Sequence, residues 1–217
     1  MALYSYVLRV DDGAAPNPYY GYCTLAICKP SIRRIAKSGD WVIGTGTSEF
    51  GKYKLIYAMK LTEKPITFQE YFEDPRFKRK KPNFRKRDKN SHLGDNIYKF
   101  TENGFKQLPS VHSSGSRENI LSKEHDLGKK LQNNRVLVSD NFYYFGKKAI
   151  KLPTNLYGLV KKGQGHKSIS ISKSKIKEFE EFIKSRSMGI NGEPIDELGP
   201  EDILDVKCKK VQRCGED

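Results

Sequence analysis

The sequence predicts an α+β protein in which a mostly antiparallel, curled or barrel-like sheet carries short peripheral helices and a C-terminal helix. Segments 4–10 and 52–64 are rich in β-branched and aromatic residues, which is typical of strands. Segment 170–187 carries isoleucine and phenylalanine at helical spacing, and Gly189 follows it as a stop.

The first part of the chain alternates strands with short helices. The expected strands are 4–10, 19–30, 41–46 and 52–64. A helix is expected at 31–39, between a plausible N-cap serine and a glycine stop. A second is expected at 67–75, where Thr67 and Glu70 have the spacing of a capping box.

The character of the chain changes at Arg76, where we expect a basic insertion, residues 76–130. Its first part, RFKRKKPNFRKRDK, holds nine lysines and arginines and only two apolar side chains, so it cannot fold alone. A strand is expected at 94–100 and an irregular loop at 101–126. The remaining expected elements are strands at 135–140, 141–146 and 148–153 and a Gly-rich basic loop at 161–168. We expect one domain, residues 1–190, followed by an acidic, loosely packed tail, residues 191–217.

The composition favours a polyanionic partner. The 217 residues carry a formal net charge of +14, and an excess of this size most often indicates nucleic acid. No apolar run reaches the length of a membrane-spanning helix, and no secretory signal is visible, so we expect a cytoplasmic protein with no membrane partner. Four cysteines are too few for a disulfide scaffold and lack zinc-ribbon spacing, so reduced thiols and no metal or cofactor are expected.

Common catalytic motifs are absent from the sequence. It contains no P-loop, GxGxxG, GxSxG or HExxH motif, which excludes the most familiar nucleotide-binding, hydrolase and zinc-protease patterns.

Several blocks resemble a known family. They are PNPYYGYCTLAICKPSIRRIAKSGDWVIGTG, YKLIYAMKLTEK, TFQEYFEDPRF, SDNFYYFGKKAIKLP and GQGHKS, and they span about Tyr4 to about Ile183. Together they resemble the nucleotide modification associated domain, second family. The resemblance implies a role connected with DNA base hypermodification and brings no established reaction with it.

A second resemblance concerns shape. The turn at Gly39, Asp40 and Trp41, followed by a long strand and a short helix, is similar to EVE, ASCH and related PUA-like domains. This similarity implies a small curled β barrel, and several such domains bind RNA or flipped, modified bases.

An aromatic set is the first candidate binding site. The residues assigned to base binding are Asn17, Tyr19, Tyr20 and Trp41. An extruded base needs flat partners on its faces and a donor or acceptor at its edge, which an Asn amide can supply. The alternative is that these rings belong to the sheet core, and for Trp41 that alternative is favoured.

Two basic segments are candidates for phosphate binding. The residues assigned are Arg79, Lys80, Lys81, Arg85, Lys86, Arg87, Lys161, Lys162, His166 and Lys167. Cations neutralise phosphates, and interleaved aromatic side chains can add stacking. The alternatives are a solvated linker for the first segment and an ordinary flexible turn for the second.

Three functional hypotheses follow. The first is a nucleic-acid or nucleotide binding domain, with DNA favoured over RNA, that recognises a modified or extruded base. The second is an enzyme of base modification or removal that uses His166 or a carboxylate such as Asp40 or Asp140, although no convincing acid/base pair appears. The third is a protein-interaction subunit of a phage or defence system. The oligomeric state stays open.

Overall fold

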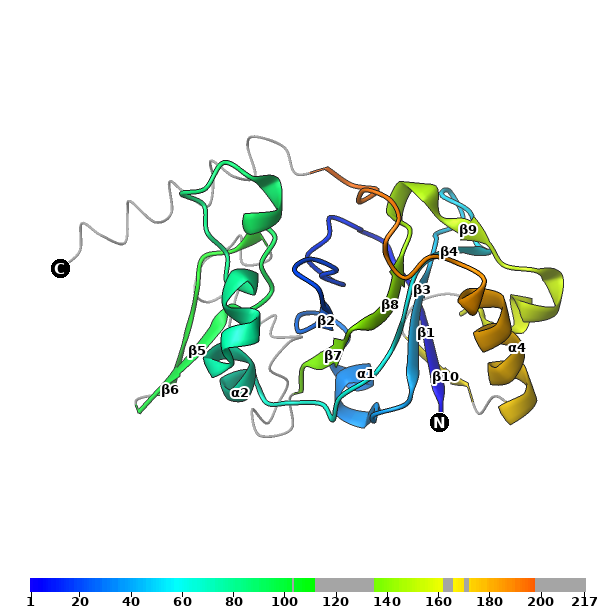
Figure 1. The fold of residues 1–217 in the computed structure, drawn as a ribbon, viewed down its shortest axis with the longest axis horizontal. Helices are drawn as coiled ribbons and strands as arrows, with labels where there is room; N and C mark the ends of the chain where they lie inside the picture. The colour runs from blue at the N-terminus through cyan, green and yellow to red at the C-terminus, as the bar shows by residue number, and fades with distance from the viewer. Residues whose placement is uncertain (103, 112–134, 162–165, 170–171, 198–217) are drawn as a thin grey trace.

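A computed structural model shows an α+β molecule built in layers around a central sheet (Figure 1). It describes residues 1–102, 104–111, 135–161, 166–169 and 172–197. Helix α4 covers one face of the sheet, and a layer containing β2, β7 and α1 covers the other. Beyond that layer lie α2, β5 and β6, at the opposite end of the long axis from α4 (Figure 1).

The central sheet is mixed and open. Its strands are β1 (Leu3–Val7), β3 (Trp41–Thr45), β4 (Lys54–Lys60), β8 (Asn141–Tyr144), β9 (Ile150–Lys151), β10 (His166–Ile169) and β11 (Gly189–Ile190). They follow the order β10-β1-β3-β4-β8-β11, and β9 pairs with β4. The pairs β1–β3 and β8–β11 are parallel and the others are antiparallel. Since β10 and β11 end the described sheet without pairing to each other, the expected curled, PUA-like barrel is not confirmed.

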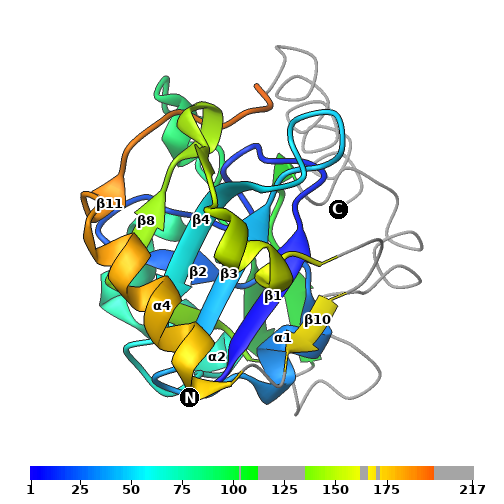
Figure 2. The ribbon, with the colours of Figure 1, turned by 90° about the vertical axis from the view of Figure 1, so that its right-hand side faces the viewer.

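One face of the sheet packs against α4 (Lys173–Lys184) and the 3-10 helix η6 (Thr154–Leu159) (Figure 2). The Phe179 ring meets the Trp41 indole edge-on, with 5.2 Å between ring centroids. Glu180 accepts hydrogen bonds from the indole nitrogen of Trp41 at 3.0 Å and from the ammonium of Lys60 at 2.7 Å. The expected C-terminal helix is thus confirmed, and these contacts attach it to β3 and β4.

The other face of the sheet packs against β2 (Cys23–Leu25), β7 (Leu137–Ser139) and α1 (Pro30–Ile35). The ring of Tyr57 lies directly over Gly44, where any Cβ would collide with it. Helix α1 is held by Arg33, a fully buried residue that donates to the carbonyls of Cys28 at 2.7 Å and Arg135 at 2.8 Å. Because strand β2 is only three residues long, most of the strand expected at 19–30 is loop.

The outer layer consists of α2 and the start of the basic insertion. Its elements are α2 (Phe68–Glu73), η1 (Pro75–Lys80), η2 (Lys89–Ser91), β5 (Tyr98–Thr101) and β6 (Gly104–Gln107). The Thr67–Glu70 capping box of α2 is present as expected. Phe77, Ile97 and Tyr98 are buried in a third core cluster. The described part of the insertion therefore supplies core residues and is not a solvated linker, because its apolar side chains pack on α2 and β7.

The described part of the tail, residues 191–197, is packed rather than loose. The amide of Asn191 donates to the Tyr144 carbonyl at 2.7 Å, and the amide of Asp196 donates to the Asp11 carbonyl at 2.9 Å. Gly146, with φ +51°, leaves no room for a Cβ beside the Glu193 carbonyl, so the chain crosses here in close contact. Residues 198–217 lie outside the described part of the chain.

Within the described residues, no helix is long and apolar enough to cross a bilayer.

Candidate nucleic-acid interface

The first feature of the candidate site is a tight loop, residues 17–23, which we call the tyrosine loop. Asn17 and Thr24 exchange two backbone hydrogen bonds of 2.9 Å at its base. Inside it, the Asn17 side-chain oxygen accepts the Tyr19 amide at 3.3 Å. Tyr20 and Gly21 then adopt positive φ values of 63° and 86°. A non-glycine residue in this region carries strain of order 1 kcal/mol or more, and the strained turn places the Tyr20 side chain partly in solvent.

Lys80 holds the tyrosine loop from inside. Its ammonium donates to the Asn17 carbonyl at 2.9 Å, to the Asn17 side-chain oxygen at 2.8 Å and to the Tyr22 carbonyl at 2.8 Å. The side chain is fully buried, and burial lowers the pKa of Lys80 to about 8, while the charge of Asp95 works in the opposite direction. Lys80 therefore fills an interior role and does not face a phosphate.

Asn17 is equally committed to the interior. It is fully buried, and its side-chain nitrogen donates to the Leu93 carbonyl at 2.8 Å while its oxygen serves Lys80 and Tyr19. The side-chain amide of Asn17 thus forms its hydrogen bonds within the protein.

The residue before Lys80 points to the outside of the same loop. The guanidinium of Arg79, an exposed residue of η1, lies 4.1 Å from the centroid of the Tyr20 ring. Cation–π contacts of this kind contribute about 0.5–1 kcal/mol at exposed positions. Arg79 and Lys80 are adjacent in η1, and they contact the tyrosine loop from the outside and from the inside. The Arg79–Tyr20 pair forms a partly exposed platform.

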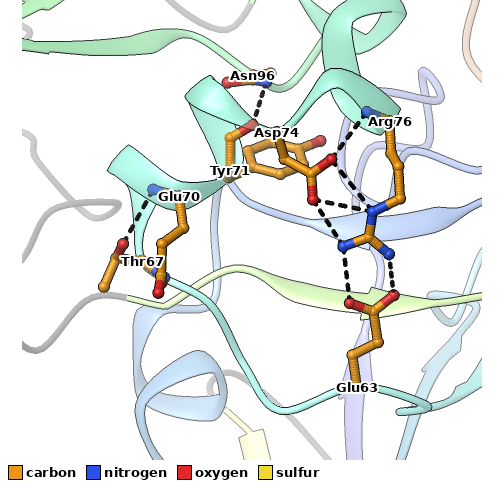
Figure 3. A network of polar contacts seen from close by, with 7 residues as sticks. All are labelled: Glu63, Thr67, Glu70, Tyr71, Asp74, Arg76 and Asn96. Carbon is orange, nitrogen blue, oxygen red and sulfur yellow. Dashed lines mark hydrogen bonds and ion pairs between the residues drawn. The ribbon is translucent and has the colours of Figure 1, made fainter.

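Arg76 anchors the start of η1 (Figure 3). It pairs with Glu63 at 2.6 Å and with Asp74 at 2.7 Å, and its guanidinium lies 5.6 Å from the Tyr22 ring centroid. The Asp74 side chain also accepts the Arg76 amide as the N-cap of η1. Because Arg76 is already paired with two carboxylates, we do not count it among the exposed cations that could bind a phosphate.

The chain after η1 forms a compact loop, residues 83–92, which we call the basic loop. The Asn83 amide donates to the Ser91 carbonyl at 2.7 Å and closes it. Asp88 caps η2 by accepting the Ser91 amide at 2.9 Å. The rings of Phe84 and His92 stack with 5.3 Å between centroids. The loop is thus internally fixed without help from its charged side chains.

The tip of the basic loop is cationic. Arg85, Lys86 and Arg87 are all exposed, and none of them forms an ion pair with another described residue. The nearby carboxylate of Asp88 contributes to a raised pKa of Tyr20, behind the larger effect of burial, which places the basic loop near the platform.

Four further lysines extend this cationic surface, namely Lys78, Lys81, Lys99 and Lys106. Burial lowers the pKa of Lys81, and the charges of Lys78 and Lys99 lower it further. Lys99 also lies directly opposite Lys106 in the β5–β6 hairpin. Like charges directly opposite on a sheet are destabilising, so a bound anion would relieve them. We call this whole surface the Tyr20 face. It consists of Tyr20, Arg79, the basic loop tip and these lysines.

Comparison with protein families adds a context to this geometry. A family model described as nucleotide modification associated domain 2 matches residues 1–200. The chain belongs to this family. Comparison with the curated proteins and with the solved structures gives no match. The family description connects the chain with nucleotide modification, and the similarity to EVE, ASCH and PUA-like domains is not confirmed.

In this nucleotide modification associated domain, a buried polar network fixes the tyrosine loop relative to α2. The carboxylate of Asp95, fully buried, accepts from the hydroxyls of Thr24 and Tyr71, both at 2.6 Å. Burial raises the pKa of Asp95. Asn96 donates to the Tyr71 carbonyl at 2.8 Å (Figure 3). These contacts join β2, α2 and the insertion into one unit beneath the Tyr20 face.

A second buried carboxylate, Asp11, joins the first loop to the C-terminal segment. It accepts the Tyr144 hydroxyl at 2.6 Å and the Ile195 amide at 3.3 Å, and its own amide donates to Asp196 at 2.6 Å. Burial raises the pKa of Asp11 to about 6 in spite of these hydrogen bonds.

Asp11→Asn is expected to remove a pH dependence of stability. The folded protein binds this proton more tightly than the unfolded chain, so ionising Asp11 destabilises the fold. Relative to the variant, the wild type should lose about 3 kcal/mol of unfolding free energy as the pH rises from about 4 to about 7. Urea unfolding of both proteins across this range measures the difference. A constant difference would contradict the raised pKa.

The structure does not bring Trp41 to Tyr20. Trp41 is 2% exposed and packs among Tyr143 and Phe179 on the α4 side of the sheet, so it is a core residue. Tyr19 is also buried, with its ring 6.3 Å from that of Tyr20. A pocket walled jointly by Tyr20 and Trp41 is therefore wrong, because the sheet separates them.

The second basic segment is only partly described. Lys161 is half-buried and Lys162 lies outside the described residues. His166 and Lys167 belong to strand β10, opposite Tyr6 and Ser5 of β1, where a flexible loop was the expectation.

The two carboxylates considered for catalysis, Asp40 and Asp140, lie in different surroundings. Asp40 is buried and accepts the Ala2 amide at 2.6 Å and the Lys37 amide at 2.9 Å, which fixes a turn. Asp140 is exposed. Burial raises the pKa of the Cys23 thiol to about 12. In the described part of the chain, no group of three or more His, Cys, Asp or Glu could hold a metal.

Sequence reasoning missed the pairing of Lys99 with Lys106, because Lys106 lies in residues 101–126, which were expected to be an irregular loop. The Asn103–Gly104 dipeptide between them is a known hairpin signal and could have revealed the pairing. For Asp11 and Asp95 no local pattern distinguishes a buried carboxylate from a surface one.

Proposed function

We propose that this domain binds unpaired or locally extruded nucleic acid at the Tyr20 face and thereby recognises a base in the course of DNA base modification. One observation carries the proposal: the partly exposed Tyr20 ring is held on a strained turn with the Arg79 guanidinium 4.1 Å from its centroid. Strain at a surface residue that supports no core packing is the kind of outlier from which a functional role is inferred.

Stacking is the interaction that this platform supports. A base has two flat faces and can lie on a tyrosine ring or an arginine guanidinium, which contributes roughly 1–3 kcal/mol per base. A stacking surface of this kind contacts the flat face of a base, and in a duplex the neighbouring bases cover that face. The platform therefore favours a base that has left its stack, and flipping requires least free energy when the base is damaged, modified or single-stranded.

Phosphates are assigned to the cations that flank the platform. Arg85, Lys86 and Arg87 are exposed without acidic partners among the described residues, and Lys78 and Lys81 lie within two residues of Arg79 in the sequence. The net charge of +14 supports the same ligand class. The family context favours DNA over RNA.

Tyr20→Ala is expected to weaken binding of single-stranded DNA by about 5–150-fold, which corresponds to about 1–3 kcal/mol. The slope of log affinity against log salt should stay unchanged, because no phosphate contact is lost. Fluorescence anisotropy with a labelled oligonucleotide, repeated over a salt series, measures both quantities.

Tyr20→Phe is the matched control for this test. It keeps the ring and should keep the affinity. Equal affinities for the wild type and Tyr20→Ala would contradict base stacking at this site. An affinity that does not change with salt would contradict polyanion binding altogether and would favour a protein-interaction role.

A further inference from the structure

A second aromatic and basic surface lies where β4, β9 and η6 meet, and we call it the β9 end. The rings of Tyr53 and Tyr157 stack with 3.7 Å between centroids and 8° between planes. Both side chains are partly exposed. Isolated aromatic pairs prefer offset or edge-on arrangements to a close face-to-face stack. This pair is thus a preformed stack of flat rings at the protein surface.

Three exposed lysines surround the stack. Lys52 lies 5.4 Å from the Tyr53 ring centroid. Lys54 lies over the Phe50 ring at 4.8 Å and is the direct cross-strand partner of Lys151. Within the described residues none of the three lysines has an ion-pair partner.

The cross-strand pair is the informative feature. Like charges directly opposite each other destabilise a strand pair. Among the strand pairs that the structure describes, lysine faces lysine at two places, Lys99–Lys106 and Lys54–Lys151. The first belongs to the Tyr20 face. The second shows the same unfavourable arrangement beside an aromatic stack, which is the combination that an approaching polyanion would stabilise.

The two surfaces lie at opposite ends of the molecule. Figure 1 shows α2 and the β5–β6 hairpin at one end of the long axis and β9 at the other. A strand that contacts both surfaces must therefore run along the long axis of the molecule.

We propose that the β9 end is a second contact surface for the same nucleic-acid strand, so that the domain binds an extended strand at two separated places. This inference rests on the proposed function, because it takes the ligand class from the Tyr20 face. Once one surface is engaged, binding at the other is intramolecular, and the combined affinity exceeds either single affinity when the strand can span both.

The test compares single-stranded DNA of about 8 and about 30 nucleotides, within and beyond the size range of a single small binding site. For the wild type the longer strand should bind on the order of 10²–10⁴-fold more tightly. In the variant Lys52→Ala/Lys54→Ala/Lys151→Ala this gain should fall to the roughly twentyfold expected from the larger number of positions on a longer strand. The salt slope for the longer strand should fall by about 2, since single strands lose about 0.7 per contact. Binding of the short strand should change little, because it occupies the Tyr20 face.

The control variant, Lys37→Ala/Lys64→Ala/Lys173→Ala, removes the same charge from exposed positions elsewhere. It should retain the full length dependence. If both triple variants lose the gain equally, net charge explains the effect and the inference is overturned. The inference also fails if the β9-end variant matches the wild type on the long strand. If Tyr20→Ala still weakens the short strand in that case, the proposed function stands, whereas absence of wild-type binding to either strand would reject the proposed function itself.

Discussion

Replacing Lys80 with methionine is expected to lower the free energy of unfolding by about 3–5 kcal/mol. The change removes one hydrogen-bond donor from each of three protein oxygens, two on Asn17 and one on Tyr22, and the Asn17 oxygens keep one other donor each. It also removes the positive charge that offsets the buried carboxylate of Asp95. Methionine fills a similar volume, so a cavity contributes little to the loss. Urea unfolding followed by tyrosine fluorescence or circular dichroism measures the effect.

Arg79→Met is the matched control for Lys80→Met. It removes a neighbouring cation of the same turn, but the lost contact is a ring contact at the surface, so the loss should stay below about 1 kcal/mol. A loss below about 1 kcal/mol for Lys80→Met as well would mean that water replaces the ammonium at the loop, and that Lys80 does not hold it.

The second large effect is expected at the tip of the basic loop. Arg85→Ala/Lys86→Ala/Arg87→Ala should weaken binding of single-stranded DNA on the order of 100-fold at about 0.1 M salt, if each cation contacts one phosphate. The salt slope should fall by about 2, and the loss should be similar for all base sequences. A salt series with two oligonucleotides of different sequence measures this.

The fold of that triple variant should be intact. The three side chains are exposed, and the loop is closed by Asn83, Asp88 and Ser91 instead. Its melting temperature should therefore match that of the wild type. An unchanged affinity would place the phosphates elsewhere, whereas a collapsed melting temperature would show that these cations stabilise the loop. A variant set that included Lys80 would confuse the two effects.

Local patterns predicted much of the fold. The Thr67–Glu70 spacing predicted the capping box, and the recurrence of Ile176, Phe179 and Ile183 predicted the face by which α4 packs. These features depend on residues close in sequence. The order of the strands depends on distant pairings, such as Leu3 with Trp41, which no local pattern contains. The expected barrel, whose closure depends on such distant pairings, is not confirmed.

The candidate site was predicted in part. The sequence pattern included both Tyr20 and Arg79 among the candidates, and the structure brings these two side chains together across many residues of sequence. It could not distinguish Arg79 from Lys80. Composition treats both as cations of one charged run, and only the turn of η1 decides that one side chain points out and the next points in. Trp41 is a core residue, which is the interpretation that the sequence analysis favoured for it over base binding.

The hydrogen bonds from Lys80 to the tyrosine loop have a consequence for native-state dynamics. Opening the loop would have to release the Asn17 and Tyr22 carbonyls together and leave a buried ammonium without acceptors. Such an opening is improbable as an isolated local fluctuation, so the loop should exchange its amide hydrogens together with η1 and the neighbouring strand β2 as one cooperative unit. Although the Tyr20 platform lies at the surface, its backbone amides would then be protected from exchange nearly as strongly as those of the core. A ligand would meet the platform already in its binding geometry.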